Sequence, residues 1–226
     1  RRVLNVECLG EIPAGRSSRK VICPLITKGV DRTGFGESIR LLRLRVEKML
    51  EEKQHKVILV SSAIPGEGKT TISVNLAISL ALKGKKVLII DCDMRNPTVG
   101  KALQVKNTTG MAEYLTGNAS VREIISTTKV DNLSVITGGT SVKAGYSELL
   151  SDKRLAQLVK AASKLFDCVI MDTPPCSLLA DASEVGTVAD AALIVIRHDF
   201  DAEFREKIGR KFEKMVAVDY CYQDIA

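Results

Sequence analysis

The chain has 226 residues, of which 45% are hydrophobic and 27% charged, and its formal net charge is +6. These values are typical of a water-soluble globular protein that can bury a sizeable core in one domain. Aromatic residues make up 4% of the chain and Trp is absent, which argues against the stacking surfaces that bind single-stranded nucleic acid. We therefore expect no nucleic-acid partner.

The cysteines and the apolar runs exclude two further classes of protein. The six cysteines include no CxxC pair, so we expect reduced, mostly buried thiols in place of disulfides or a metal site. No apolar run approaches the roughly 18 residues of a membrane span, and the chain itself is expected to be soluble. It begins with Arg-Arg and not with Met, which suggests a fragment of a longer protein.

Composition divides the chain into three segments. Residues 1–34 combine prolines, glycines and a basic patch, and we predict an irregular N-terminal arm with one short strand near Val21–Ile26. Residues 35–200 alternate apolar runs with helical patterns and form the predicted main domain. Residues 201–226 are predicted to form a charged helix, to about residue 215, and a short tail that carries tyrosines.

Residues 36–53 are the first predicted helix, because apolar residues recur along them at helical spacing. Glu37, Arg40 and Arg43 lie three residues apart on this helix. Taken alone, they indicate a solvated helix face with one ion pair, which contributes about 0.2–0.5 kcal/mol. A role in contacts between subunits is the alternative, and it depends on resemblance to a known family.

Residues 57–71 read VILVSSAIPGEGKTT and join a buried strand to a glycine-containing loop and an apolar helix. This is the setting of a phosphate-binding loop, in which backbone N–H groups and a helix N-terminus bind an anion. The pattern G-x-x-x-x-G-K-[ST] is met except at its first position, Ala63. Lys69 is expected to reach the β- and γ-phosphates and Thr70 to bind Mg²⁺. The predicted nucleotide-binding residues are Pro65, Gly66, Glu67, Gly68, Lys69, Thr70 and Thr71.

Carboxylates end two of the later apolar runs. Val87–Ile90 is followed by Asp91-Cys92-Asp93, and a second run ends in Asp172. At the carboxyl ends of parallel strands, these side chains would face the crevice in which α/β proteins bind ligands. Two carboxylates two residues apart can hold Mg²⁺ or its waters and orient a nucleophile. An Asx turn at the strand end is the structural alternative.

The remaining elements decide the fold class. Strands are predicted at Leu133–Thr137 and Ala192–Arg197, and helices at about 152–165 and 181–189. Strands separated by helices throughout predict an α/β fold, a doubly wound and mostly parallel sheet with helices on both faces. An acidic strand end directly after the phosphate-loop helix points to P-loop NTPases of the partition-ATPase-like branch. No N-K-x-D segment indicates guanine, so ATP is the expected nucleotide.

The combination of motifs resembles the bacterial tyrosine kinases, the BY-kinase family of capsule and exopolysaccharide assembly. The resemblance implies an ATP-dependent protein-tyrosine kinase that autophosphorylates between the subunits of a ring, phosphorylates protein tyrosines and regulates polysaccharide biosynthesis and export. The similar stretches cover roughly residues 7–200 and read LGEIP, ESIRLLR, SSAIPGEGKTT, VLIIDCDMRNP, GMAEYLTG, NLSVITGG, SELL and FDCVIMDTPP.

The resemblance assigns roles to the acidic and basic residues of the predicted site. It implies ATP and Mg²⁺ as cofactors and Lys69, Asp91, Asp93 and Asp172 as catalytic residues. Thr70 and the three aspartates would hold Mg²⁺. Either Asp91 or Asp93 would accept or orient the proton of the incoming tyrosine.

The same resemblance implies partners and a cellular location. Glu37, Arg40 and Arg43 would form the contacts between subunits of the ring. LGEIP ahead of the kinase is similar to the form in which a membrane-spanning chain-length regulator precedes it. We therefore expect such a regulator or activator, fused or separate, and a place on the cytoplasmic side of the inner membrane.

Departures from the family pattern keep two other functions open. The final strand and the long tyrosine-rich tail of the family are not recognisable, and Tyr220 and Tyr222 are the candidate phosphoacceptors. A regulatory domain that binds nucleotide without transferring phosphate is therefore one alternative. A partition or division-type ATPase switch is the other, but the signature lysine of that class is replaced here by Ile64.

Overall fold

The computed structural model describes part of the chain, and the fold is given for these ranges: residues 8–13, 34–53, 56–106, 108–140, 149–150, 153–176, 186–197 and 215–221. The strands are β1 Cys8–Pro13, β2 Val57–Ser62, β3 Val87–Asp91, β4 Ile125–Thr127, β5 Leu133–Ile136, β6 Cys168–Asp172, β7 Ala191–Arg197 and β8 Met215–Cys221. The helices are α2 Gly34–Met49, α3 Lys69–Ala81, α4 Val99–Ala102, α5 Met111–Leu115, α6 Val121–Ile124 and α8 Lys153–Leu165. None of these helices is long and apolar enough to cross a membrane.

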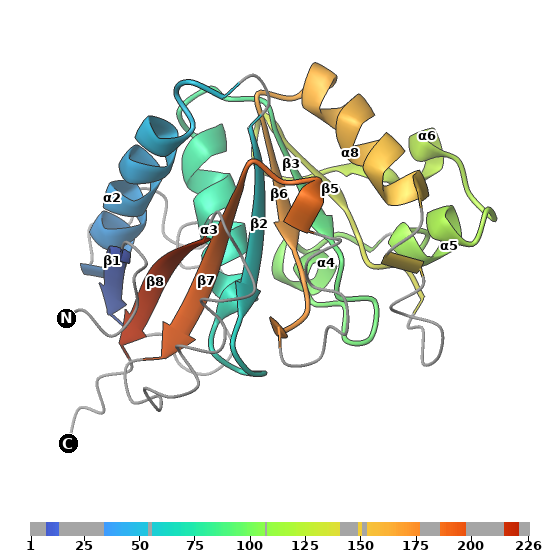
Figure 1. The fold of residues 1–226 in the computed structure, drawn as a ribbon. Coiled ribbons are helices and arrows are strands. Elements are labelled where there is room, and N and C mark those ends of the chain that lie inside the picture. Colours follow the sequence, from blue (N-terminus) through green and yellow to red (C-terminus); the bar gives the residue numbers. More distant parts are fainter. Residues whose placement is uncertain are drawn as a thin grey trace.

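One eight-stranded sheet organises the described residues, with the strand order β1-β8-β7-β2-β6-β3-β5-β4 (Figure 1). All neighbouring strands are parallel except β4 and β5, which are antiparallel. Strands β3, β4, β5 and β6 lie on one side of β2 and strands β7 and β8 lie on the other, so the chain builds the sheet in both directions from β2, which is the doubly wound arrangement. The predicted fold class is confirmed.

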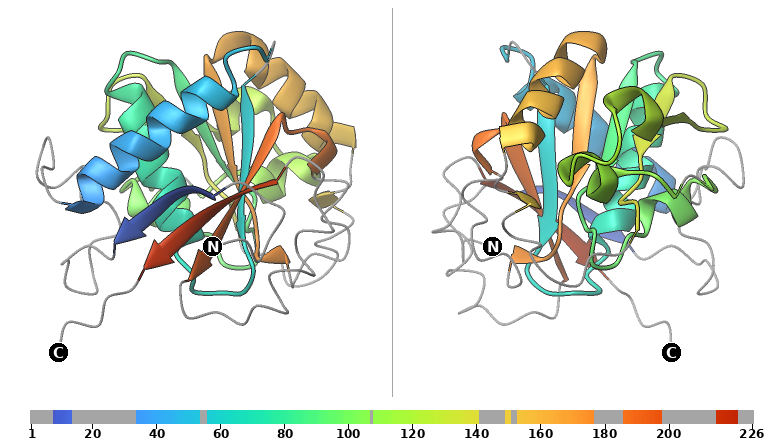
Figure 2. Two further views of the ribbon diagram at one scale, coloured as in Figure 1. Left: turned by 60° about the vertical axis from the view of Figure 1, so that its left-hand side comes forward. Right: turned by 90° about the vertical axis from the view of Figure 1, so that its right-hand side faces the viewer.

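Two hydrophobic cores hold helices on opposite faces of the sheet (Figure 2). Ile58 and Val60 of β2 contribute to the core that also contains residues of α2, α3 and α4. Val57 and Leu59 alternate with them and contribute to the core beneath α5, α6 and α8. Because both faces are covered, the central strands are apolar up to their carboxyl ends, as expected for parallel strands.

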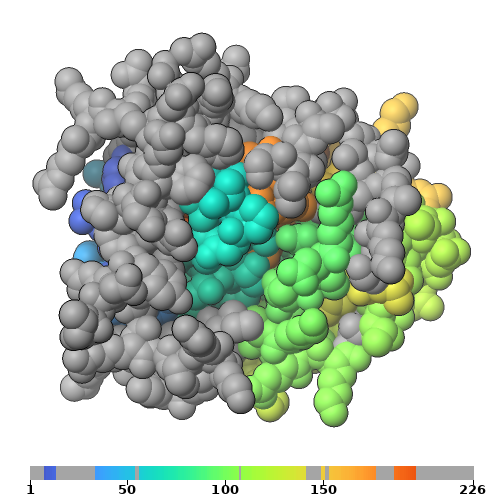
Figure 3. Space-filling model, turned by 90° about the horizontal axis from the view of Figure 1, so that it is seen from below, coloured from blue at the N-terminus to red at the C-terminus, as the bar shows by residue number. Residues whose placement is uncertain are grey.

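The carboxyl ends of the central strands bring the predicted site together. Asp172 of β6 is in register with Asp91 of β3 on one side and with Val60 of β2 on the other. Figure 3 looks onto this edge of the sheet and shows the cyan residues that follow β2 beside the green residues that follow β3. The phosphate loop and both acidic strand ends therefore meet at one edge.

The N-terminal segment differs from the predicted irregular arm. Residues 8–13 form the edge strand β1, which pairs in parallel with β8. Leu9 and Ile12 are 4% and 0% exposed and belong to the core on the α2 face. Burial of these two side chains under α2 explains why the segment is ordered as a strand. The predicted strand at Val21–Ile26 lies outside the described residues.

The C-terminal segment also differs from its prediction. Residues 215–221 form β8, which lies between β1 and β7 and pairs with both. The sequence MVAVDYC contains β-branched and aromatic residues, which favour a strand, and the prediction of a helix followed by a tail is therefore wrong for these residues. The short edge strand β4 was also missed. The predicted helix at 201–215 and most of that at 181–189 lie outside the described residues.

Candidate active site

The loop between β2 and α3 has the backbone conformation that a phosphate-binding loop needs. Gly66 and Gly68 have φ angles of 87° and 91°, which residues with a Cβ rarely adopt. Ala63, which replaces the first glycine of the pattern, is not among the described residues with positive φ, so the departure is tolerated. The carboxylate of Glu67, 2% exposed, accepts the backbone N–H of Ile64 over 3.0 Å and ties the loop to itself.

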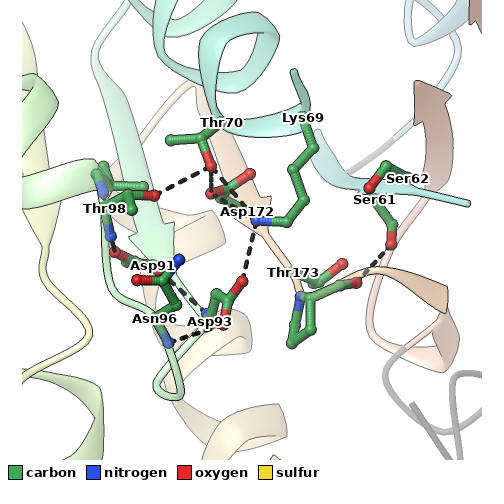
Figure 4. A network of polar contacts seen from close by, with 12 residues as sticks. Ser61, Ser62, Lys69, Thr70, Asp91, Asp93, Asn96, Thr98, Asp172 and Thr173 are labelled. Atoms are coloured by element: carbon green, nitrogen blue, oxygen red, sulfur yellow. Dashed lines mark hydrogen bonds and ion pairs between the residues drawn. The ribbon is translucent and has the colours of Figure 1, made fainter. Parts of the chain in front are cut away.

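Lys69, the first residue of α3, joins the phosphate loop to the acidic strand ends (Figure 4). Its Nζ lies 3.0 Å from Oδ2 of Asp93 and 3.9 Å from Oδ2 of Asp172. Burial lowers the pKa of Lys69, but attraction by Asp172 and Asp93 outweighs it, so the pKa is raised. The ammonium charge is therefore held where the carboxyl ends of β2, β3 and β6 meet.

Asp172 is fully buried at the end of β6 and is held by two hydroxyl groups of α3. Thr70 donates to its Oδ2 over 2.7 Å and Ser73 to its Oδ1 over 2.8 Å. Burial raises the pKa of Asp172, while Lys69 and the two hydroxyl donors lower it, and the net shift is upward. Asp172 thus orients the Thr70 hydroxyl as well as contributing charge.

Asp91 and Asp93 have different surroundings although they are two residues apart. Oδ2 of Asp91 accepts the N–H groups of Thr98 and Val99, each at 3.0 Å, and Oδ1 accepts that of Asp93 at 3.1 Å. Burial, and next the charge of Asp172, raise the pKa of Asp91 to about 8. Asp93 is 7% exposed and faces Lys69. Asp91 is held by three loop N–H groups, whereas Oδ1 of Asp93 accepts one, that of Asn96 over 3.2 Å, and its Oδ2 faces Lys69.

The donor set of this cluster fits Mg²⁺ bound together with a nucleotide. The described residues contain no group of three or more His, Cys, Asp or Glu side chains that could hold a metal ion by themselves. Mg²⁺ in nucleotide sites usually keeps several waters and takes the remaining ligands from phosphates and from one or two side chains. A threonine hydroxyl at a helix start, beside carboxylates, is such a set.

The three residues predicted on α2 do not share one environment. Glu37 and Arg40 form an exposed ion pair. The side chain of Arg43 is 7% exposed and pairs with Glu47 over 2.6 Å within its own helix. Leu41 and Leu44 are 54% and 53% exposed on the outer side of α2. The outer face of this helix therefore presents Glu37, Arg40 and two leucines, whereas Arg43 faces inward.

Of the two candidate phosphoacceptors, Tyr220 lies near the carboxyl end of β8. Tyr220 is part of this strand and is in register with Ile12 of β1 and Arg197 of β7. The predicted tail thus begins later than expected, because Tyr220 belongs to the sheet. Tyr222 lies outside the described residues.

Sequence reasoning missed two hydroxyl groups of the site. Ser73 and Thr98 contact Asp172 and Thr70, respectively. The position of Ser73, one helical turn after Lys69, could have indicated its role. The position of Thr98 gave no such signal, since the loop after β3 has no periodicity.

Comparison with known proteins assigns the central part of the chain to a family. Residues 55–208 match the model of the AAA domain. The chain is 38% identical over 181 residues to the tyrosine-protein kinase YwqD of Bacillus subtilis, covering 80% of this chain and 74% of that protein. It is 37% identical over 163 residues to a Klebsiella pneumoniae protein named as a tyrosine-protein kinase in a cps region. That match covers 72% of this chain but 22% of the longer relative.

Solved structures agree with the fold of the described residues. The kinase domain of Escherichia coli tyrosine kinase ETK is 25% identical, with a TM-score of 0.85, and the match covers 98% of this chain and 93% of that one. The cell division ATPase MinD of Pyrococcus furiosus is also 25% identical, but its TM-score is 0.61 and 74% of this chain and 71% of that one are covered. The tyrosine kinase domain is thus the more similar of the two.

Proposed function

The chain belongs to the family of bacterial tyrosine-protein kinases, and from this premise we propose that it transfers the γ-phosphoryl group of ATP to tyrosines, including its own. The observation that carries the proposal is the meeting of Lys69, Asp93 and Asp172 beside a glycine loop. Phosphoryl transfer depends on positioning and charge neutralisation more than on covalent chemistry. A buried ammonium and adjacent carboxylates at a phosphate loop supply both.

Each residue of the cluster has a role that follows from its contacts. Lys69 would bind the β- and γ-phosphates. In the structure, its ammonium group pairs with the carboxylates of Asp93 and Asp172 instead. Thr70, with Asp91, Asp93 and Asp172 beside it, would hold Mg²⁺. The bound ion would supply neutralisation of phosphate charge. Asp93 is favoured over Asp91 to accept or orient the tyrosine proton, because three backbone N–H groups already engage Asp91.

Tyr222 is the better acceptor of the two candidates. Tyr220 lies in β8, whose backbone pairs with strands on both sides, so its entry into an active site requires β8 to leave the sheet. Tyr222 follows the last residue of that strand. The parallel strands β8 and β2 end at the same edge, and the chain therefore leaves the sheet on the side of the phosphate loop.

We place this transfer in an assembly of several copies that acts in polysaccharide production. The exposed ion pair and leucines of α2 support a contact between subunits through Glu37 and Arg40. The buried side chain of Arg43 would contribute to this contact indirectly, by orienting Glu47. The resemblance to kinases of capsule and exopolysaccharide assembly, and a relative in a cps region, support a membrane chain-length regulator as partner and a site at the cytoplasmic membrane surface.

Phosphopeptide analysis after incubation with ATP and Mg²⁺ tests the proposal. We expect phosphotyrosine at Tyr222, its loss in Lys69→Met, and its retention in the exposed control Lys83→Met. Mixing Lys69→Met with an active Tyr222→Phe chain should restore phosphate on the Lys69→Met chain if transfer occurs between subunits. ATP hydrolysis without phosphotyrosine would favour the partition-type ATPase. Nucleotide binding without hydrolysis or transfer would favour a regulatory domain.

A further inference from the structure

Thr98 is the N-cap residue of α4, but its hydroxyl does not cap the helix. An N-cap threonine ordinarily accepts a backbone N–H from the second or third residue of its helix. The Thr98 side chain makes no such bond in α4. The carboxylate of Asp91 instead accepts the N–H groups of Thr98 and Val99. The Thr98 hydroxyl is therefore left for another partner.

That partner is Thr70, the residue at the start of α3 whose hydroxyl is expected to bind the metal. Oγ1 of Thr98 lies 3.2 Å from Oγ1 of Thr70, and Thr70 donates its own proton to Oδ2 of Asp172 over 2.7 Å (Figure 4). A hydroxyl has one proton and two lone pairs. With the proton directed to Asp172 and one lone pair to Thr98, the second lone pair of Thr70 faces the Lys69 ammonium over 3.4 Å, and it is this lone pair that a bound cation would take.

We propose that Thr98 is a positioning residue, whose hydroxyl holds that of Thr70 in the orientation that binds Mg²⁺ together with the nucleotide. The proposal rests on the proposed function, since it concerns the same site. A chain of hydroxyls that ends on a buried carboxylate restricts rotation about the Thr70 side chain more than Asp172 does alone. Thr98 therefore couples the loop after β3 to the phosphate loop.

Calorimetric titration with ADP, in the presence of Mg²⁺ and in the presence of EDTA, tests the proposal without turnover. In Thr98→Val, which keeps the shape and removes the hydroxyl, we expect the Mg²⁺-dependent gain in ADP affinity to fall about tenfold. Affinity in EDTA should stay within about twofold. Thr98→Ser should restore the gain. Thr116→Val is the matched control, because the Thr116 hydroxyl bonds to Ala112 O of its own helix.

Two results would overturn the proposal while leaving the proposed function intact. One is an unchanged Mg²⁺-dependent gain in Thr98→Val. The other is an equal loss of affinity with and without Mg²⁺, which would indicate a merely structural role. If Thr98→Val does not fold, Thr98→Ala takes its place under the same criteria. A chain with native Thr98 that fails to bind ADP in either condition would instead refute the proposed function.

Discussion

At the scale of single residues, the site separates carboxylates that look equivalent in sequence. Asp91 is fully buried and bonded to three backbone N–H groups, whereas Asp93 is 7% exposed and faces Lys69. A carboxylate held by the loop cannot turn toward a substrate without releasing the loop. Asp91 is therefore the more firmly held of the two, since Asp93 accepts a single loop N–H, from Asn96, and this difference is why we propose Asp93 as the group that meets the incoming hydroxyl.

This difference predicts the effect of Asp93→Asn. Loss of a general base typically lowers the rate by about 10²–10⁴-fold, and we expect kcat for autophosphorylation to fall within that range. The KM for ATP should change by less than about threefold, since the phosphates are bound by the loop and Lys69. Asp131→Asn, in a surface turn, serves as the control. Steady-state kinetics that show kcat within threefold of the native value would contradict the role.

At the scale of elements, one side chain ties α5 to the loop after β5. Oε2 of Glu113 accepts the N–H of Gly110 over 2.8 Å, and Oε1 accepts the N–H of Thr140 over 3.0 Å as well as the Thr140 hydroxyl. Burial raises the pKa of Glu113, but these hydrogen bonds outweigh it and the pKa is lowered. The ionised form is therefore the one that holds the two elements together.

The sign of that shift predicts the pH dependence of Glu113→Gln. A carboxyl whose pKa is lower in the folded state stabilises the fold above its unfolded pKa, about 4.5, and loses this contribution as the pH falls through its folded pKa. Thermal unfolding should show a lower Tm for Glu113→Gln at pH 7 and a much smaller difference at pH 3. The exposed Glu52→Gln is the control. An equal difference at both pH values would refute the assignment.

Helix α2 shows that spacing alone does not determine which residues share a face. Glu37, Arg40 and Arg43 are evenly spaced, and the resemblance implied one common contact surface. In the folded chain, Arg43 is buried and bonds to Glu47, while Leu41 and Leu44 take its place on the outer face. Residues spaced three apart do not stay on one face of a helix, since a full turn takes 3.6 residues. Packing against the sheet decides which of them lie on the buried face and which on the exposed face.

At the scale of the whole molecule, the two cores share one sheet. Ile58 and Val60 face one core while Val57 and Leu59 face the other, so each strand of the centre belongs to both. Loss of packing on either face therefore weakens the same strands. The parallel connections are long, and the described residues should unfold together as one cooperative unit.

A pair of leucines at α3 tests this description. Leu76 is fully buried against the sheet, whereas Leu82, just after the helix, is 61% exposed. Leu76→Ala should lower the free energy of unfolding by about 2–5 kcal/mol, because it leaves a cavity, and Leu82→Ala by less than about 0.5 kcal/mol. Urea denaturation followed by circular dichroism and fluorescence should give coincident transitions. Separate transitions for the two probes would contradict a single cooperative unit.

The sequence by itself determined the fold class and indicated which side chains meet at the phosphate loop and the acidic strand ends. Apolar runs ending in Asp91 and Asp172, and the glycine loop before Lys69, are local patterns whose physical cause lies within a few residues. The described strands and helices around them were found near their predicted positions, and the tyrosine kinase family inferred from the motifs is confirmed by the comparisons.

Only the tertiary structure decided how these residues are used. It made β1 and β8 neighbours, although they lie at opposite ends of the chain, and so moved Tyr220 from a tail into the sheet. It also set Asp91 apart from Asp93 and brought Thr98 to Thr70. These relations depend on strand order and on contacts between residues far apart in sequence, which no local pattern encodes because hydrogen-bond partners are chosen by the packed fold.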